Sequence, residues 1–131
     1  MKKFLPVFVY LSFAWNLFLV IGVVFGASYA LERAAGGQYE SFPSLIRVIY
    51  VFNTLFVIYQ LFVFIQFQKK YALAKIWVLK LFCLVGSLSF VVNLASRSPL
   101  ERWNTVPALF ITLAFFNQLI IKRKELNHEN N

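Results

Sequence analysis

Four long apolar stretches separated by short polar segments constrain the fold of this chain more than any other feature. They cover residues 4–29, 45–67, 76–95 and 103–121. A helix rises about 1.5 Å per residue, so about 20 residues cross the roughly 30 Å hydrocarbon core of a membrane. Only 14% of the residues are charged, against roughly 25% in soluble domains. The sequence therefore predicts an all-α membrane protein, a bundle of four transmembrane helices with short loops, and excludes a soluble enzyme.

The distribution of basic residues predicts how this bundle is oriented. The termini and the middle loop hold eight Lys and Arg residues, whereas the first and third loops together hold three. Cytoplasmic segments are enriched in Lys and Arg, so we expect both termini to be cytoplasmic, in a bacterial cytoplasmic membrane. Orientation and contact with anionic lipids, rather than nucleic-acid binding, then explain the net charge of +8. The eight basic residues are Lys2, Lys3, Lys69, Lys70, Lys75, Lys122, Arg123 and Lys124.

The whole chain, residues 1–131, reads as one integral membrane domain with a polar, disordered tail over residues 125–131. A cleaved secretory signal is the alternative interpretation of residues 1–30, because Lys2 and Lys3 precede an apolar run that ends in Ser28-Tyr29-Ala30. That run is longer than the roughly 7–15 apolar residues of a signal core, which favours an uncleaved first helix.

Two features of the predicted helices and loops call for specific local structure. Ser98-Pro99-Leu100-Glu101 in the third loop is a capping-box pattern, with Pro at the first helical position, and it predicts a short helical turn. Trp15 lies in the middle of the first helix. Tryptophan usually lies near a membrane boundary, so its position in the middle of a helix requires either a packing role or a partner for its N–H.

The residues that usually perform catalysis are missing from the predicted helices. The chain has no Asp, its Glu residues lie in loops or the tail, and its one His, His128, is in the tail. Its one cysteine, Cys83, has no second cysteine to pair with and is expected to pack as a small apolar residue. We therefore predict no catalytic residue, no metal site and no cofactor, and we do not expect an enzyme.

Amide side chains are the polar groups that the predicted helices do contain. Each helix carries at least one Asn, and a buried amide in lipid needs a partner or costs several kcal/mol. Asn16, Asn53 and Thr54 are expected to meet in the outer half of the bundle, with Arg47 above them. We predict that these four residues line a polar pocket. The alternative is that the amides form hydrogen bonds that hold the helices together.

Small residues in the first stretch predict a close helix contact. Gly22 and Gly26 form a GxxxG motif that Ala30 extends at the same spacing, so the three residues would share one face of a helix. The partner helix belongs either to this chain or to a second copy, and the pattern does not choose between them.

These observations leave three classes of function. The first is a non-catalytic accessory, assembly or stabilising subunit that binds another membrane protein. The second is a small channel or carrier, a homo-oligomer that uses the amides within its helices. The third is a protein that binds a lipid or an isoprenoid. Membrane lipids are expected partners in all three, and nucleic acid in none.

Overall fold

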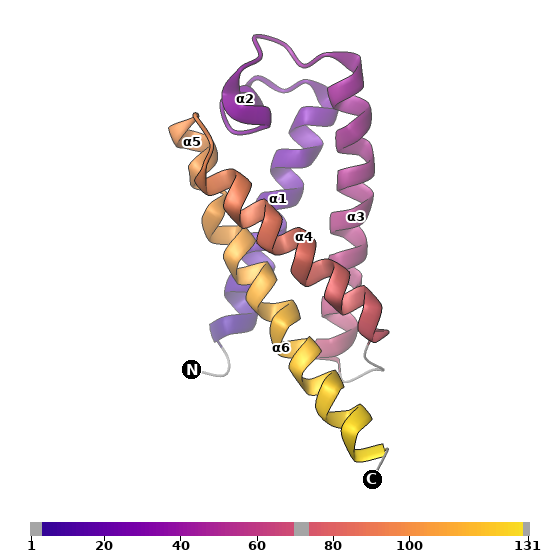
Figure 1. The fold of residues 1–131 in the computed structure, drawn as a ribbon. Helices are drawn as coiled ribbons and strands as arrows, with labels where there is room; N and C mark the ends of the chain where they lie inside the picture. The colour runs from indigo at the N-terminus through magenta and orange to yellow at the C-terminus, as the bar shows by residue number, and fades with distance from the viewer. Residues whose placement is uncertain (1–3, 70–73, 130–131) are drawn as a thin grey trace.

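The computed structural model describes residues 4–69 and 74–129, and it is all-helical over these residues (Figure 1). Over the described residues, the all-α fold and the predicted number of long helices are confirmed, and each of the four is long and apolar enough to cross a membrane. Three short helices lie in the connections between them. In chain order the helices are α1 (Phe4–Phe25), α2 (Ser28–Leu31), η1 (Ala35–Gly37), α3 (Ser44–Gln68), α4 (Ile76–Leu94), α5 (Pro99–Arg102) and α6 (Thr105–Glu129).

The long helices form a bundle in which α1 and α6 are central (Figure 1). α3 packs against α1, and α4 packs against α6, whereas α3 and α4 are not closely packed against each other. α1 begins and α6 ends at one end of the bundle, here called the terminal end, and α3 also ends there (Figure 1). α2, η1 and α5 lie at the opposite end, here called the capped end (Figure 1). Lys2, Lys3 and Lys70 lie outside the described residues.

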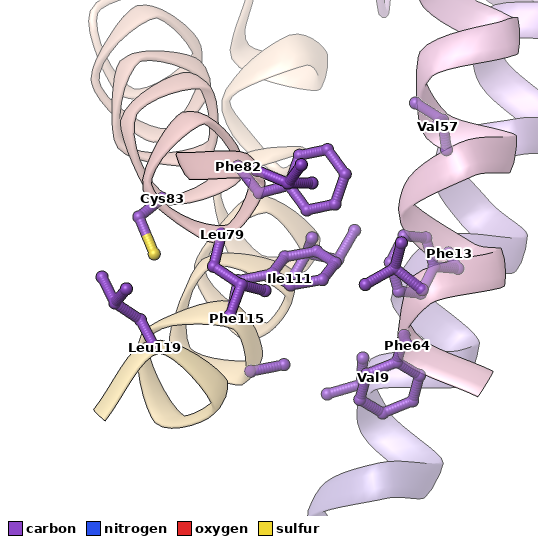
Figure 2. Close-up of a cluster of buried hydrophobic side chains, with 13 residues drawn as sticks. Val9, Phe13, Val57, Phe64, Leu79, Phe82, Cys83, Ile111, Phe115 and Leu119 are labelled. Atoms are coloured by element: carbon purple, nitrogen blue, oxygen red, sulfur yellow. The ribbon is translucent and has the colours of Figure 1, made fainter. Parts of the chain in front are cut away.

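One aromatic ring from each long helix meets in the core of the bundle (Figure 2). Phe82 of α4 and Phe115 of α6 have ring centroids 4.7 Å apart. Phe13 of α1 lies 6.4 Å from the Phe115 ring and 5.9 Å from the ring of Phe64 in α3. All four side chains are buried. We call this group the aromatic layer, and tilted ring pairs of this kind contribute about 0.5–1.5 kcal/mol each beyond their buried area.

The first helix ends earlier than predicted, at Phe25 rather than at residue 29. Gly26 adopts φ +71°, a left-handed conformation that glycine tolerates best. The Gly26 N–H donates to Val23 O at 3.1 Å and the Ala27 N–H donates to Gly22 O at 2.8 Å. These two bonds form a Schellman motif, which satisfies carbonyl groups at the end of a helix.

The predicted small-residue face is therefore wrong, because Gly26 terminates α1 and Ala30 belongs to α2. Gly22 does take part in a close contact, within the chain. Tyr29 of α2 folds back along α1, where its ring stacks on Phe18 at 4.3 Å and its hydroxyl donates to Phe18 O at 2.7 Å. A Cβ atom at Gly22 would collide with the Tyr29 ring.

The last helix extends further than predicted at the terminal end. α6 continues to Glu129, so the segment predicted to be disordered from residue 125 is helical as far as the structure describes it. Lys122 and Glu125, three residues apart, form an ion pair at 3.5 Å, and pairs at this spacing support an exposed helix. Residues 130–131 of the predicted tail lie outside the described residues.

Candidate functional site

Two adjoining cavities lie between the four long helices and extend from the capped end to just past the middle of α3. The first has a volume of about 180 Å³ and the second about 260 Å³. They adjoin because both are lined by Asn16 of α1, Asn53 of α3, Ala108 of α6, and Ser89 and Val92 of α4. We call the joined space the amide cavity. Together its two parts fall in the size range of small-ligand sites, roughly 300–1,000 Å³.

A buried carboxylate forms part of the roof of the amide cavity. Glu101 of α5 lines the cavity and is only 7% exposed. Its Oε2 accepts hydrogen bonds from the Gly36 N–H, at 2.9 Å, and from the Ser96 hydroxyl. Ser98 caps α5, as predicted, by accepting from the Glu101 N–H. The carboxylate thus links η1 of the first connection to the segment between α4 and α5.

A second pair of hydrogen bonds completes the roof. The Trp15 indole donates to Asn104 Oδ1 at 2.9 Å, which supplies the partner that this mid-helix tryptophan required. Asn104 Nδ2 in turn donates to Arg33 O at 2.8 Å. Arg33 also lines the cavity, and its guanidinium donates to Tyr29 O at 3.0 Å. The oxygen and the nitrogen of the Asn104 amide are therefore both used, and they hold α1, the α2–η1 segment and the connection between α5 and α6 together.

The wall of the cavity offers amides that are not used in this way. The side chains of Asn16 and Asn53 form no hydrogen bond with any residue that the structure describes. Asn93 of α4 also lines the cavity, and its Nδ2 is occupied by Ser89 O at 2.8 Å and Ser89 Oγ at 3.2 Å. The wall can thus donate and accept hydrogen bonds at several positions without carrying a charge.

Gln60 of α3 lies at the deepest polar position of the amide cavity. Its side chain is 4% exposed, it lines the cavity, and it has no hydrogen-bond partner among the described residues. Val57 and Ile111 line the same part of the cavity and belong to the hydrophobic core that contains the aromatic layer (Figure 2). The polar cavity therefore ends on an apolar floor.

The amide cavity opens sideways between α3 and α4. Leu88 and Val92 of α4 line it and are 61% and 57% exposed, and Asn53 of α3 and Ser89 of α4 are exposed as well. Further toward the terminal end, Phe82 closes this gap through ring contacts with Phe56 and Tyr59 at 5.4 and 5.6 Å. The opening therefore lies beside the polar part of the cavity.

The structure brings together two of the four residues predicted to form a pocket. Asn16 and Asn53 line the amide cavity, but Arg47 and Thr54 are not among its lining residues. Arg47 donates to Val24 O at 2.7 Å, near the end of α1, where helix carbonyls lack partners within the helix. Thr54 donates to Tyr50 O at 2.7 Å, a bond to the preceding turn that is common for Thr in helices.

The sequence did not identify the deepest polar residue of the cavity or the residues that line it nearest the capped end. Gln60 is a further amide side chain within a predicted helix. It follows Asn53 by seven residues, so both lie on one side of α3. Asn104, Glu101 and Arg33 carried no such signal, because they lie in connections whose paths depend on tertiary contacts.

Two other polar features lie closer to the terminal end. A cavity of about 530 Å³ is lined mostly by apolar residues of α1, α3 and α6 and by Asn117. Gln118 is fully buried, at 0% exposure, and neither atom of its amide has a partner in the described chain.

The chemical capacity of the amide cavity is binding by hydrogen bonds. Glu101 is its one acidic lining residue, and the described residues contain no group of three or more His, Cys, Asp or Glu side chains that could hold a metal ion. No protein-family model, curated protein or solved structure matches this chain.

Proposed function

We propose that this chain is a multi-pass membrane protein that binds a small amphipathic molecule from the bilayer in the amide cavity. The observation that carries the proposal is Gln60, whose side chain is 4% exposed, lines the cavity and forms no hydrogen bond with the described residues. Leaving such a group unpaired costs about 1–3 kcal/mol. A bound molecule that supplied the missing hydrogen bonds would remove this cost.

The position of the opening supports entry from the lipid. The exposed residues Asn53 and Ser89 lie at the rim between α3 and α4, where a membrane would present hydrocarbon rather than water. Polar side chains at such a rim are expensive when they face acyl chains. The polar group of an amphipathic molecule bound at this rim would contact the Asn53 and Ser89 side chains, while its apolar part remained in the lipid. The aromatic layer lies on the terminal side of the cavity and fills the core there, which favours a closed binding site over an open pore.

The proposal is tested by native mass spectrometry of the protein released from its own membrane in mild detergent. We expect wild type to retain one lipid-sized molecule per chain. Gln60→Leu and Asn53→Leu should lose it, whereas Gln66→Leu should keep it, because Gln66 lies on the same helix but does not line the cavity. Wild type without a bound molecule, or equal retention in all three variants, contradicts the proposal.

An accessory subunit is a second candidate, favoured by the exposed face of α3. This helix has the smallest buried share of the four, 22% of its most apolar window. Its exposed side includes Phe52, Leu55 and Phe62, and such a face can contact a second membrane protein or a second copy of the chain. The same spectra test this candidate. A complex with another chain at fixed stoichiometry supports it, and a monomer contradicts it.

A further inference from the structure

We infer that the molecule bound in the amide cavity is an uncharged lipid of the quinone class, with its ring between Asn16, Asn53 and Gln60 and its tail leaving between α3 and α4. This inference rests on the proposed function and specifies the chemistry of its ligand. It follows from three properties of the cavity: its charge, its depth and the placement of its unpaired amides.

The charge of the lining disfavours an ionic headgroup. Arg33 and Glu101 are the charged residues that line the cavity, and they have opposite signs. Both are also engaged within the protein, Arg33 with Tyr29 O and Glu101 with the Gly36 N–H and the Ser96 hydroxyl. They line only the part of the cavity nearer the capped end, whereas the part that holds Gln60 is lined by no charged residue. A phosphate group beside Gln60 would therefore have no counter-charge, which is strongly unfavourable.

The depth of the lining amides leads to the same conclusion. At about 1.5 Å per residue, Asn53 lies about 13 Å and Gln60 about 24 Å along α3 from Ser44, the first residue of that helix. Gln60 also lies about 12 Å before Gln68, the last residue of α3, so a polar group bound there would lie inside a hydrocarbon core roughly 30 Å thick and away from the headgroups on both sides. Charged groups at such depth are costly, whereas an uncharged ring can reach it.

The unpaired amides match acceptors at both ends of a flat ring. Asn53 and Gln60 are seven residues apart on α3, about 10 Å along its axis, and Asn16 faces the same space from α1. A para-quinone carries one carbonyl oxygen at each end of its ring, and the amide side chains bridge the remaining distance. A prenol, with a single hydroxyl group, would leave at least one of these amides unpaired. Phe56 lines the same part of the cavity and provides an apolar surface for the ring.

Trp15 provides the means to test this inference, because it lines the amide cavity and quinones quench tryptophan fluorescence on contact. The other two tryptophans, Trp77 and Trp103, are exposed and can be replaced in a Trp77→Phe/Trp103→Phe background. In detergent, decylubiquinone should quench the remaining Trp15 emission saturably. Gln60→Leu in this background should weaken binding about tenfold, the equivalent of about 1.4 kcal/mol, and Gln66→Leu should not change it.

Loss of binding in Gln60→Leu can be separated from loss of folding. Replacing an unpaired buried amide by an apolar group of similar size is close to neutral for stability, so the thermal unfolding curve should not shift downward. Asn53→Leu, at the exposed rim, is the second variant and should weaken binding as well. Quenching that is linear rather than saturable, or equal in the Gln60 and Gln66 variants, overturns the inference.

Competition with dioleoylphosphatidylglycerol distinguishes the inference from the proposed function. We expect this anionic lipid to leave the decylubiquinone signal unchanged at equal concentration. If it displaces the quinone, the ligand class is wrong, but the cavity still binds a lipid and the proposed function stands. If native spectra show no bound molecule and decylubiquinone does not bind, both fail.

Discussion

Buried polar residues have two distinct roles in this molecule, and their hydrogen bonds separate them. Glu101 and Asn104 are buried and form hydrogen bonds that hold the connections at the capped end together. Asn16 and Gln60 line a cavity and lack partners among the described residues. The sequence could predict that amides lie within helices. It could not assign either role, because the role depends on which residues of other helices lie opposite.

The role assigned to Glu101 leads to a prediction about stability. Glu101→Leu removes the acceptor of the Gly36 N–H and the Ser96 hydroxyl, and should lower the free energy of unfolding by about 1–3 kcal/mol. Glu101→Gln keeps a carbonyl oxygen in place and should lose less. Thermal unfolding in detergent, followed by circular dichroism, measures both. A Leu variant as stable as wild type would show that this carboxylate does not hold the capped end.

For the helices, the length of each apolar stretch was enough to predict that a helix forms there. The residue at which each helix ends depends instead on local interactions. The Ser98 cap and Pro99 predicted α5 correctly because their pattern is local. The end of α1 was mispredicted because residues 27–31 are mostly apolar and resemble a continuing helix. The left-handed conformation of Gly26 and the stacking of Tyr29 on Phe18 turn the chain back instead.

The turn at Gly26 can be tested without altering any packing contact. A Cβ atom at Gly26 would meet no atom within 4 Å, so substitution there changes the backbone alone. Gly26→Val should destabilise the protein by about 1–2 kcal/mol, because a β-branched residue is strained at positive φ. Gly26→Asn is the matched control and should lose clearly less, since Asn tolerates this conformation. Equal unfolding temperatures for the two variants would contradict the proposed role of the turn.

For the whole molecule, the sequence predicted the number and order of the long helices but not which of them pack together. The period of the apolar residues does not indicate which face of a helix is buried, because apolar residues cover all sides of each long helix. The central position of α1 and α6 follows instead from specific contacts, such as the close approach of Gly86 in α4 to Thr112 in α6. The opening between α3 and α4 is a consequence of that arrangement.

The orientation of the bundle is the property of the whole molecule that most needs measurement. The described terminal end carries five basic residues, Lys69, Lys75, Lys122, Arg123 and Lys124, against the two acidic residues Glu125 and Glu129, whereas basic and acidic side chains are more evenly mixed at the capped end. We propose that the terminal end is cytoplasmic, as this asymmetry favours. The amide cavity would then lie in the outer half of the bilayer, and its ligand would enter from the outer leaflet.

Cysteine labelling of the full chain in bacterial cells tests this orientation. Cys83 is buried and can be replaced by Ala to give a background without cysteine. In that background, Ser41→Cys lies in the connection before α3 and His128→Cys lies near the end of α6, and both positions are exposed. A membrane-impermeant maleimide should label the Ser41 variant in intact cells and the His128 variant only after lysis. The reverse pattern would place the amide cavity in the inner half of the bilayer, so that its lipid would come from the cytoplasmic leaflet.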